Sequence, residues 1–297
     1  MPNTLATPAA SVSPSPSVTK PLHLDWLVDT GERLATADGK VIEVWEFRHL
    51  PDKATLSAWA KHFRNHYCLD SDIDALRAAR TRQQYLEDIK FPSRNSTLGP
   101  SVRAGDFGEI LIADYLQWLL GYWVPRVRWN AKIVRDESSK GSDVIGFRMQ
   151  NPADTSPDDT LAIFESKTKF SSSTVNRLQD AINDSAKDHI RIDESLNYIK
   201  QRLLDKGLTD QAKQVERFQN PVDFPYRQLF GAAALYSADH FQATEVCAAD
   251  CQKVPSSASP TGFKPHPNHD ALALVVIRGA DMMPLVHSLY QRAADEA

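Results

Sequence analysis

Residues 141–170, "GSDVIGFRMQNPADTSPDDTLAIFESKTKF", decide the fold because they hold two short apolar runs joined by a polar loop. Each run has the length and composition of a β-strand. Side chains two positions apart in a strand point to the same face, so Glu165 and Lys167 project together. Asp143 stands at the start of the first run. If the two strands are neighbours, Asp143 and Glu165 converge on one point with Lys167 beside them.

The chain around this stretch alternates between helical and strand patterns. From residue 104 onward we expect a helix, three strands, helices, a strand and a helix. This order indicates an α/β fold with a mixed central sheet flanked by helices. The expected strands are 40–50, 123–130, 141–149, 161–170 and 271–279. The expected helices are 54–68, 73–89, 105–121, 171–190, 193–217, 226–237 and the segment after Asp281.

Composition divides the chain into three parts. Residues 1–20 are rich in Pro, Ser, Thr and Ala, which predicts a disordered tail, and they lack the basic and apolar regions of a secretory signal. We expect residues 21–95 to form an N-terminal α/β accessory region that docks on the core or on a partner. The turn-forming run "FPSRNSTLGP" (91–100) marks the boundary to a main domain over 100–297.

Overall composition favours a protein of the cytoplasm. No apolar run reaches the roughly 20 residues of a membrane span. Three cysteines, an odd number, do not suggest a disulfide framework, so we expect a reducing compartment.

The paired carboxylates and the lysine indicate phosphodiester chemistry. Asp143, Glu165 and a backbone carbonyl form an all-oxygen site suited to Mg²⁺ or Mn²⁺. Such an ion activates water and neutralises charge on a phosphate, and Lys167 could orient that water. A further carboxylate, Glu109, lies in an apolar helix where an unpaired charge is costly, and a metal ion would satisfy it.

Structural alternatives remain for each of these residues. Glu165 and Lys167 could form an ion pair at a sheet edge, with Asp143 as a turn residue after glycine. Glu109 could pair with Arg103 or with the helix N-terminus.

The order of helix and strands, with Asp143 on one strand and Glu165-x-Lys167 on the next, resembles the PD-(D/E)xK nuclease superfamily. That resemblance implies a restriction-endonuclease-like core over 100–297 with an N-terminal α/β extension. The usual proline before the first acid is replaced here by Gly141 and Ser142.

The segments "GDFGEILIADYL", "KGSDVIGF" and "LAIFESKTKFSSS" resemble more narrowly the nuclease-like subunit (protein A) of Hachiman-type antiphage defence systems and AbpA relatives. This resemblance covers about residues 101–170. It implies an Mg²⁺-dependent deoxyribonuclease that acts as effector beside a superfamily 2 helicase. Asp143, Glu165, the Ser166 carbonyl and Glu109 would hold the metal, and Lys167 would orient the attacking water. A catalytically quiet scaffold and a stand-alone restriction or repair nuclease are the alternatives.

A basic stretch could bind the substrate. Residues 123–148 hold six Lys or Arg and three Asp or Glu, in a chain whose net charge is −4. Such side chains bind DNA phosphates with little sequence preference, although an ordinary mixed surface is the alternative. The candidate phosphate-binding residues are Arg126, Arg128, Lys132, Lys140 and Lys169.

Two weaker patterns concern cysteine and histidine. Cys247 and Cys251, followed by His266 and His269, loosely resemble a zinc site, although small-residue packing and surface histidines explain them equally. The histidines at 62 and 66 lie one turn apart on a predicted helix, which we interpret as a solvated face.

Overall fold

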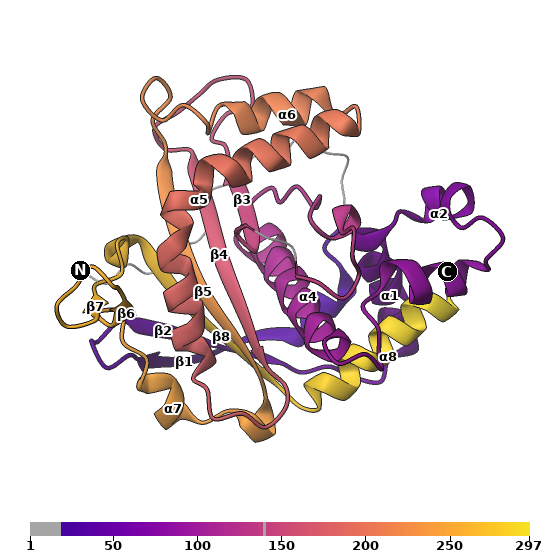
Figure 1. Ribbon diagram of the computed structural model, residues 1–297, viewed down its shortest axis with the longest axis horizontal. Coiled ribbons are helices and arrows are strands. Elements are labelled where there is room, and N and C mark those ends of the chain that lie inside the picture. The colour runs from indigo at the N-terminus through magenta and orange to yellow at the C-terminus, as the bar shows by residue number, and fades with distance from the viewer. Residues whose placement is uncertain (1–18, 139–140) are drawn as a thin grey trace.

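The computed structural model describes residues 19–138 and 141–297, so the predicted tail lies almost entirely outside the described residues. Within them, one six-stranded mixed sheet has the order β1-β2-β8-β5-β4-β3 (Figure 1). The four inner strands run parallel, and the edge strands β1 and β3 are antiparallel to their neighbours. The strands are β1 Leu27–Ala35, β2 Val41–Phe47, β3 Val144–Arg148, β4 Thr160–Lys169, β5 Arg227–Ser237 and β8 Leu272–Gly279.

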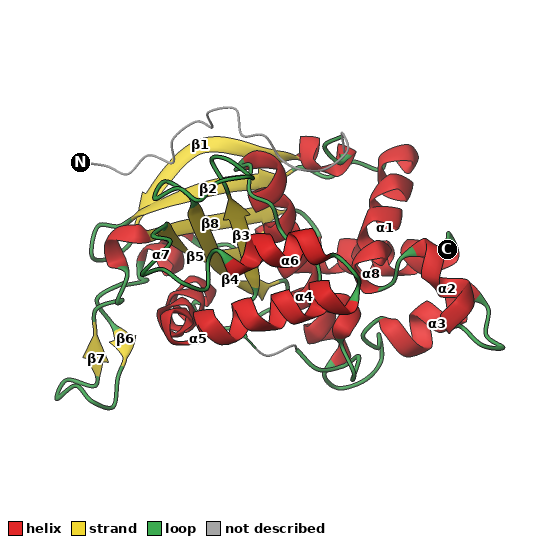
Figure 2. Cartoon of the chain, turned by 90° about the horizontal axis from the view of Figure 1, so that it is seen from above, coloured by secondary structure: helices red, strands yellow, loops and turns green. Residues whose placement is uncertain are grey.

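Helices cover both faces of this sheet, which confirms the predicted α/β class (Figure 2). Because strand side chains alternate, Phe164 belongs to the core on one face and Ile163 to the core on the other. The first face packs on α1 (Lys53–Tyr67), α4 (Gly99–Asp114) and α8 (Met282–Asp295). The second packs on α5 (Arg177–Asp205) and α6 (Thr209–Glu216).

Short elements fill the connections. The short α-helices are α2 Asp70–Leu76, α3 Arg82–Tyr85 and α7 Ala243–Cys247. The 3-10 turns are Leu22–Trp26, Trp129–Ala131, Ala238–His240 and His269–Ala271, and the π-turns are Leu86–Lys90 and Tyr115–Leu119. A two-stranded ribbon pairs β6 (Val254–Pro255) with β7 (Phe263–Lys264).

The N-terminal region is continuous with the main sheet. Strand β2 pairs in parallel with β8, with Val44 opposite Val276. Both valines are fully buried. Residues 21–95 therefore contribute two strands to the sheet that carries Glu165.

The expected helix over 226–237 is wrong, because this segment is strand β5. Its run of Gly231 and three alanines pairs with β4 on one side and with β8 on the other. A Cβ on Gly231 would come within 2.3 Å of the Phe164 ring. The small residues are needed for close strand packing, and tertiary contacts override local propensity.

Several other predicted strands and helices differ from the structure in where they begin and end. The expected strand 123–130 makes one antiparallel bridge, from Trp123 to Phe147, and then a 3-10 turn, because Pro125 has no N–H to donate. The expected helix 73–89 is broken into α2, α3 and a π-turn. Helix α5 continues unbroken through the expected gap near residue 191 and ends before Gly207, whose φ is +71°. Strand β1 was not expected.

No helix in the described part of the chain has both the length and the apolar character to cross a membrane.

Candidate functional site

The register of β3 and β4 brings Asp143 to Glu165. These strands are antiparallel neighbours with Val144 opposite Phe164, so Asp143 lies one step before β3 at the level of Glu165. The Ser166 backbone N–H donates to Asp143 Oδ2 at 3.1 Å. The predicted convergence of the two carboxylates required their strands to be neighbours, and β3 and β4 are neighbours in the structure.

Lys167 lies on the same face as Glu165, and both side chains face α5. Lys167 Nζ lies 3.6 Å from Glu165 Oε2 and 2.7 Å from Asp184 Oδ2. The lysine side chain is about a quarter exposed, whereas Glu165 is buried. Neighbouring carboxylates, Asp143 first among them, raise the pKa of Lys167 despite its burial, so it is a cation.

Helix α5 adds two acids that sequence reasoning missed, Asp184 and Asp188. The Ser142 hydroxyl donates to Asp188 Oδ1 at 2.8 Å, and Asp188 is fully buried. The sequence pattern could have indicated them. Asp184 and Asp188 are one turn apart, and Asp188 lies on the apolar face of the helix, where burying an unpaired carboxylate is costly.

The carboxylates repel one another in this setting. Burial, followed by the charges of Asp143 and Asp188, raises the pKa of Glu165 well above its usual range. Burial likewise raises the pKa of Asp188 to about 7. Glu165 Oε1 and Asp188 Oδ2 are buried without a hydrogen-bond partner among the described residues. Orphaned carboxylate oxygens of this kind fit a hard divalent cation such as Mg²⁺ or Mn²⁺.

Glu109 reaches the site from α4 through Arg128. Arg128 Nε donates to Glu109 Oε2 at 3.1 Å, and Trp129 Nε1 donates to the same oxygen at 3.2 Å. Burial raises the pKa of Glu109 to about 8, although the Arg128 charge opposes this shift. Neither alternative partner is used, because the Arg103 guanidinium donates to the Pro92 carbonyl and Glu109 lies ten residues after the start of α4 at Gly99.

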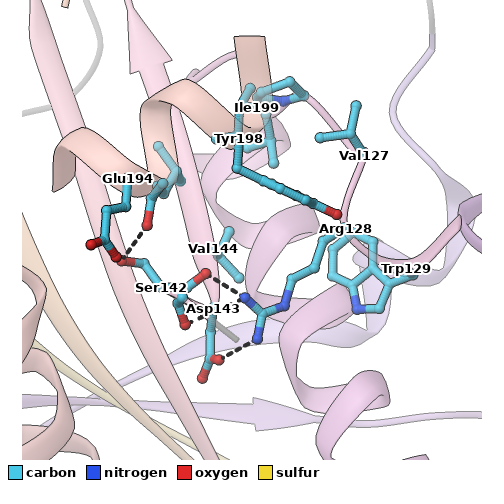
Figure 3. Close-up of a pocket in the computed structure, with 14 residues that line it drawn as sticks. Val127, Arg128, Trp129, Ser142, Asp143, Val144, Glu194, Tyr198 and Ile199 are labelled. Carbon is cyan, nitrogen blue, oxygen red and sulfur yellow. Dashed lines mark hydrogen bonds and ion pairs between the residues drawn. The ribbon is translucent and has the colours of Figure 1, made fainter. Parts of the chain in front are cut away.

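The Arg128 guanidinium also binds the β3 side of the site (Figure 3). Arg128 Nη2 donates to Asp143 Oδ1 at 3.0 Å, and Nη1 donates to the Ser142 carbonyl at 2.6 Å. A pocket with apolar walls, including Val127 and Ile199, lies beside this contact. Arg128 therefore supplies positive charge between Glu109 and Asp143.

Comparison with known proteins gives a family. The HamA family model matches residues 22–293. The chain belongs to the HamA family. It is also similar to the Hachiman protein HamA of Bacillus cereus, with 29% identity over 138 residues. That match covers 44% of this chain and 46% of the relative, so it spans about half the length of each.

The candidate phosphate-binding residues of this HamA-family chain are engaged in ion pairs. Their expected role needs exposed cations, yet their side chains are only 4–18% exposed. Besides Arg128, the pairs are Arg126 with Asp114, Lys132 with Asp106, and Lys169 with Glu245, each at 2.6 Å. These ion pairs would have to open before the side chains could bind phosphate, so their role in DNA binding stays a prediction. Lys140 lies outside the described residues.

A groove beside Lys167 offers more exposed cations, although Arg177 pairs with Asp180 and Lys187 with Asp184. It runs between α5 and the β6–β7 ribbon and is lined by Lys167, Arg177, Lys187 and Lys264, together with Asp180 and Asp184. Sequence reasoning missed it, because Arg177 and Lys264 are far apart along the chain. The ribbon and the helix come together only in the tertiary structure.

The expected solvated face at His62 and His66 is wrong for His66, which is buried. Its Nδ1 contacts the His62 carbonyl at 2.9 Å. His62 Nε2 and His23 Nε2 both contact the buried Asp114 carboxylate, at 2.9 and 3.0 Å. Burial lowers the pKa of His23 and His66 below the ordinary histidine value. Helix α1 is thus joined to α4 by a buried polar network.

Proposed function

We propose that this HamA-family protein is a metal-dependent deoxyribonuclease with a PD-(D/E)xK-type core, acting as an effector in Hachiman-type antiphage defence. One observation carries the chemical part. Asp143 and Glu165 meet on neighbouring strands beside Lys167, with a Glu165 oxygen buried and unpartnered among the described residues. The defence role rests on membership of the HamA family and on the Hachiman relative.

Each residue has a definite part in the proposal. Asp143, Glu165 and the Ser166 carbonyl would hold Mg²⁺ or Mn²⁺, and Asp188 and Glu109 would help to hold the ion through water. The ion, when bound, activates water and neutralises charge on the phosphate. Lys167, held by Asp184 at 2.7 Å, would position the attacking water and oppose charge developing on the phosphate.

The groove lined by Lys167, Arg177, Lys187 and Lys264 is the proposed path of the DNA backbone. Its cations are separate side chains on strand β4, helix α5 and the β6–β7 ribbon, with no fixed array that could read base edges. Binding by such residues falls steeply with salt and shows little sequence preference.

The partner in the proposal is a superfamily 2 helicase, which the sequence resemblance implies. Co-expression of the tagged chain with a superfamily 2 helicase from the same genome tests this partner directly. Co-purification at equal stoichiometry supports the complex, and elution of the tagged chain without the helicase rejects it.

A catalytically quiet scaffold is the second candidate, and the Arg128 contact favours it. A guanidinium that donates to both Glu109 and Asp143 supplies the positive charge that a metal ion would otherwise bring. The three acids Asp143, Glu165 and Asp188 also do not bring three oxygens within 4.8 Å of one another among the described residues. Metal binding would therefore require Arg128 to move.

The deciding experiment is cleavage of supercoiled plasmid by the purified chain with Mg²⁺ or Mn²⁺. Glu165→Ala, Lys167→Ala and an EDTA sample are run beside the wild type. Metal-dependent nicking that both variants lose supports the nuclease. If the chain alone is silent, the same assay is run on the helicase complex with ATP, and silence there favours the scaffold.

A further inference from the structure

Three side chains with metal-binding atoms meet at the base of the β6–β7 ribbon, away from the carboxylates of the candidate nuclease site. Asp38 comes from the turn between β1 and β2, Cys251 from the segment before the ribbon, and His269 from the 3-10 turn after it. Their ligand atoms all lie within 4.8 Å of one another. Residues more than 200 positions apart thus converge on one point.

The two oxygens of Asp38 have different surroundings. Oδ1 accepts from the Thr36 hydroxyl at 2.6 Å and from the Cys251 backbone N–H at 3.1 Å. Oδ2 faces His269 Nε2 at 3.1 Å. One oxygen is therefore held by supporting hydrogen bonds while the other is directed at the imidazole, as in carboxylates that bind metal.

The histidine has a matching second contact. His269 Nδ1 lies 3.4 Å from Asp270 Oδ1, so a carboxylate is near the ring nitrogen opposite the cluster. Metal-binding histidines commonly donate that second N–H to a carboxylate, which fixes the ring orientation. Lys40, the nearby cation, donates to the His269 backbone carbonyl at 2.6 Å and not to the cluster's ligand atoms.

A second cluster, formed by His23, His62 and Asp114, is a weaker candidate. There the Arg126 guanidinium already donates to Asp114 at 2.6 Å and lies 3.4 Å from His62 Nε2. A metal ion would meet this positive charge at close range. No such contact is formed by a guanidinium at the Asp38 cluster among the described residues.

We propose that Asp38, Cys251 and His269 bind a structural Zn²⁺ ion. Zinc is the common ion whose preferred ligands include thiolate, imidazole and carboxylate together, and it favours four ligands. A water completes the set, or His266, which lies outside the 4.8 Å cluster and would have to turn its ring toward the ion. The His266 side chain is buried, its Nε2 has no hydrogen-bond partner among the described residues, and its backbone N–H donates to the Cys251 carbonyl. Binding displaces the thiol proton of Cys251, which leaves to solvent.

The ion would join the turn between β1 and β2 to both ends of the ribbon. The ribbon is a two-residue pairing of Val254–Pro255 with Phe263–Lys264, too short to hold its own position. It supplies Lys264 to the groove beside Lys167. The proposed zinc thus fixes one wall of that groove, although the zinc inference does not depend on nuclease activity.

The test measures zinc in the purified full-length chain, expressed in zinc-supplemented medium without an affinity tag that binds metal. Mass spectrometry of the eluted protein should give about one zinc ion per chain. Cys251→Ser and His269→Gln should each lower that content at least about tenfold. Cys247→Ser is the matched control, because Cys247 lies outside the cluster that the described residues form, and it should keep its zinc.

A second measurement covers variants that fail to fold. The wild-type chain, stripped of metal and loaded with Co²⁺, should show a thiolate-to-metal absorption band that added Zn²⁺ removes. Glu165→Ala should behave as wild type here, which separates this site from the proposed nuclease site. Absence of both bound zinc and the cobalt band in wild type, or zinc content unchanged in Cys251→Ser and His269→Gln, overturns the proposal.

Discussion

The Arg128 guanidinium lies between two carboxylates that the proposed nuclease would use to bind a metal ion. It donates to Glu109 on α4 and to Asp143 before β3, and its side chain is only 12% exposed. A buried ion pair of this kind is costly to break, because the remaining acids stay buried without a partner. The same acids are the candidate ligands of a divalent cation, so guanidinium and metal compete for them.

Arg128→Ala should therefore destabilise the protein by about 3–5 kcal/mol in metal-free buffer. Mg²⁺ or Mn²⁺ should restore part of the loss by supplying the missing positive charge. Urea unfolding with and without the ion measures both effects. Arg217→Ala is the matched control, since Arg217 and Asp159 form a buried pair near the opposite end of β4. If the ion stabilises both variants equally, Arg128 does not occupy the place of a metal.

Asp188 tests the contribution of α5 to catalysis. Asp188→Asn keeps a hydrogen-bond acceptor for the Ser142 hydroxyl, so the fold should persist. It removes a carboxylate beside Glu165, and we expect metal-dependent cleavage to fall about tenfold or more with a higher metal requirement. Plasmid cleavage across a range of Mg²⁺ concentrations measures this. Wild-type cleavage at every concentration would exclude Asp188 from the site.

The buried histidines make stability depend on pH. Burial holds the pKa of His66 and His23 below the value near 6.5 of an unfolded chain. Below that pH the unfolded state binds protons that the folded state does not, so stability falls as pH drops from about 6.5. The slope is at most about 1.4 kcal/mol per pH unit for each histidine.

His66→Gln should therefore flatten the loss of unfolding free energy between pH 7 and pH 5. Urea unfolding at several pH values measures the slope. His49→Gln is the control, because His49 contacts the Ala280 carbonyl at the surface. A slope unchanged in His66→Gln would show that His66 does not titrate in this way.

At the level of elements, α4 lies unusually close to β4 because of one glycine. A Cβ at Gly108 would come within 2.7 Å of the Thr168 methyl and 3.1 Å of the Ser166 hydroxyl. Gly105, one turn earlier, has no atom within 4 Å of such a Cβ. The close approach of α4 to β4 therefore depends on Gly108 and not on Gly105.

Gly108→Ala should destabilise the protein by about 1–3 kcal/mol through overpacking. Gly105→Ala should stabilise it by roughly 0.5–1 kcal/mol, because alanine favours the helix. Thermal and urea unfolding of the two variants give the comparison, in which each serves as the other's control. Equal effects of the two substitutions would contradict the close contact between α4 and β4.

At the level of the whole molecule, the N-terminal region belongs to the main fold. Strand β2 covers one edge of β8, and Trp59 and Phe63 of α1 pack on Phe107 of α4. Removing the region would expose the β8 edge and a large apolar surface on α4 and α8. Its docking on a partner through other surfaces stays a prediction.

A fragment of residues 96–297 should therefore fail to fold into a native structure. Near-ultraviolet circular dichroism and cooperative urea unfolding of the fragment test this. The full chain under the same conditions is the control. Cooperative unfolding of the fragment would mean that residues 21–95 form a separate accessory unit.

Some parts of the fold and the candidate site follow from local pattern alone. The apolar runs in 141–149 and 161–170 predicted β3 and β4, and the strand period of two assigned Glu165 and Lys167 to one face. Helix α1 was predicted from apolar residues at helical spacing, and α4 from a run that is apolar on nearly every side. These properties depend on residues near one another in the chain, so the sequence by itself determined them.

Other parts were decided only by the tertiary structure. The Gly-Ala run of β5 is a strand because two neighbouring strands enclose it, and Arg128 is an ion-pair partner because α4 and β3 meet around it. Asp188, the groove beside Lys167 and the cluster of Asp38, Cys251 and His269 join segments distant in sequence. Burial and long-range charge set these features, and both arise only when the chain is packed.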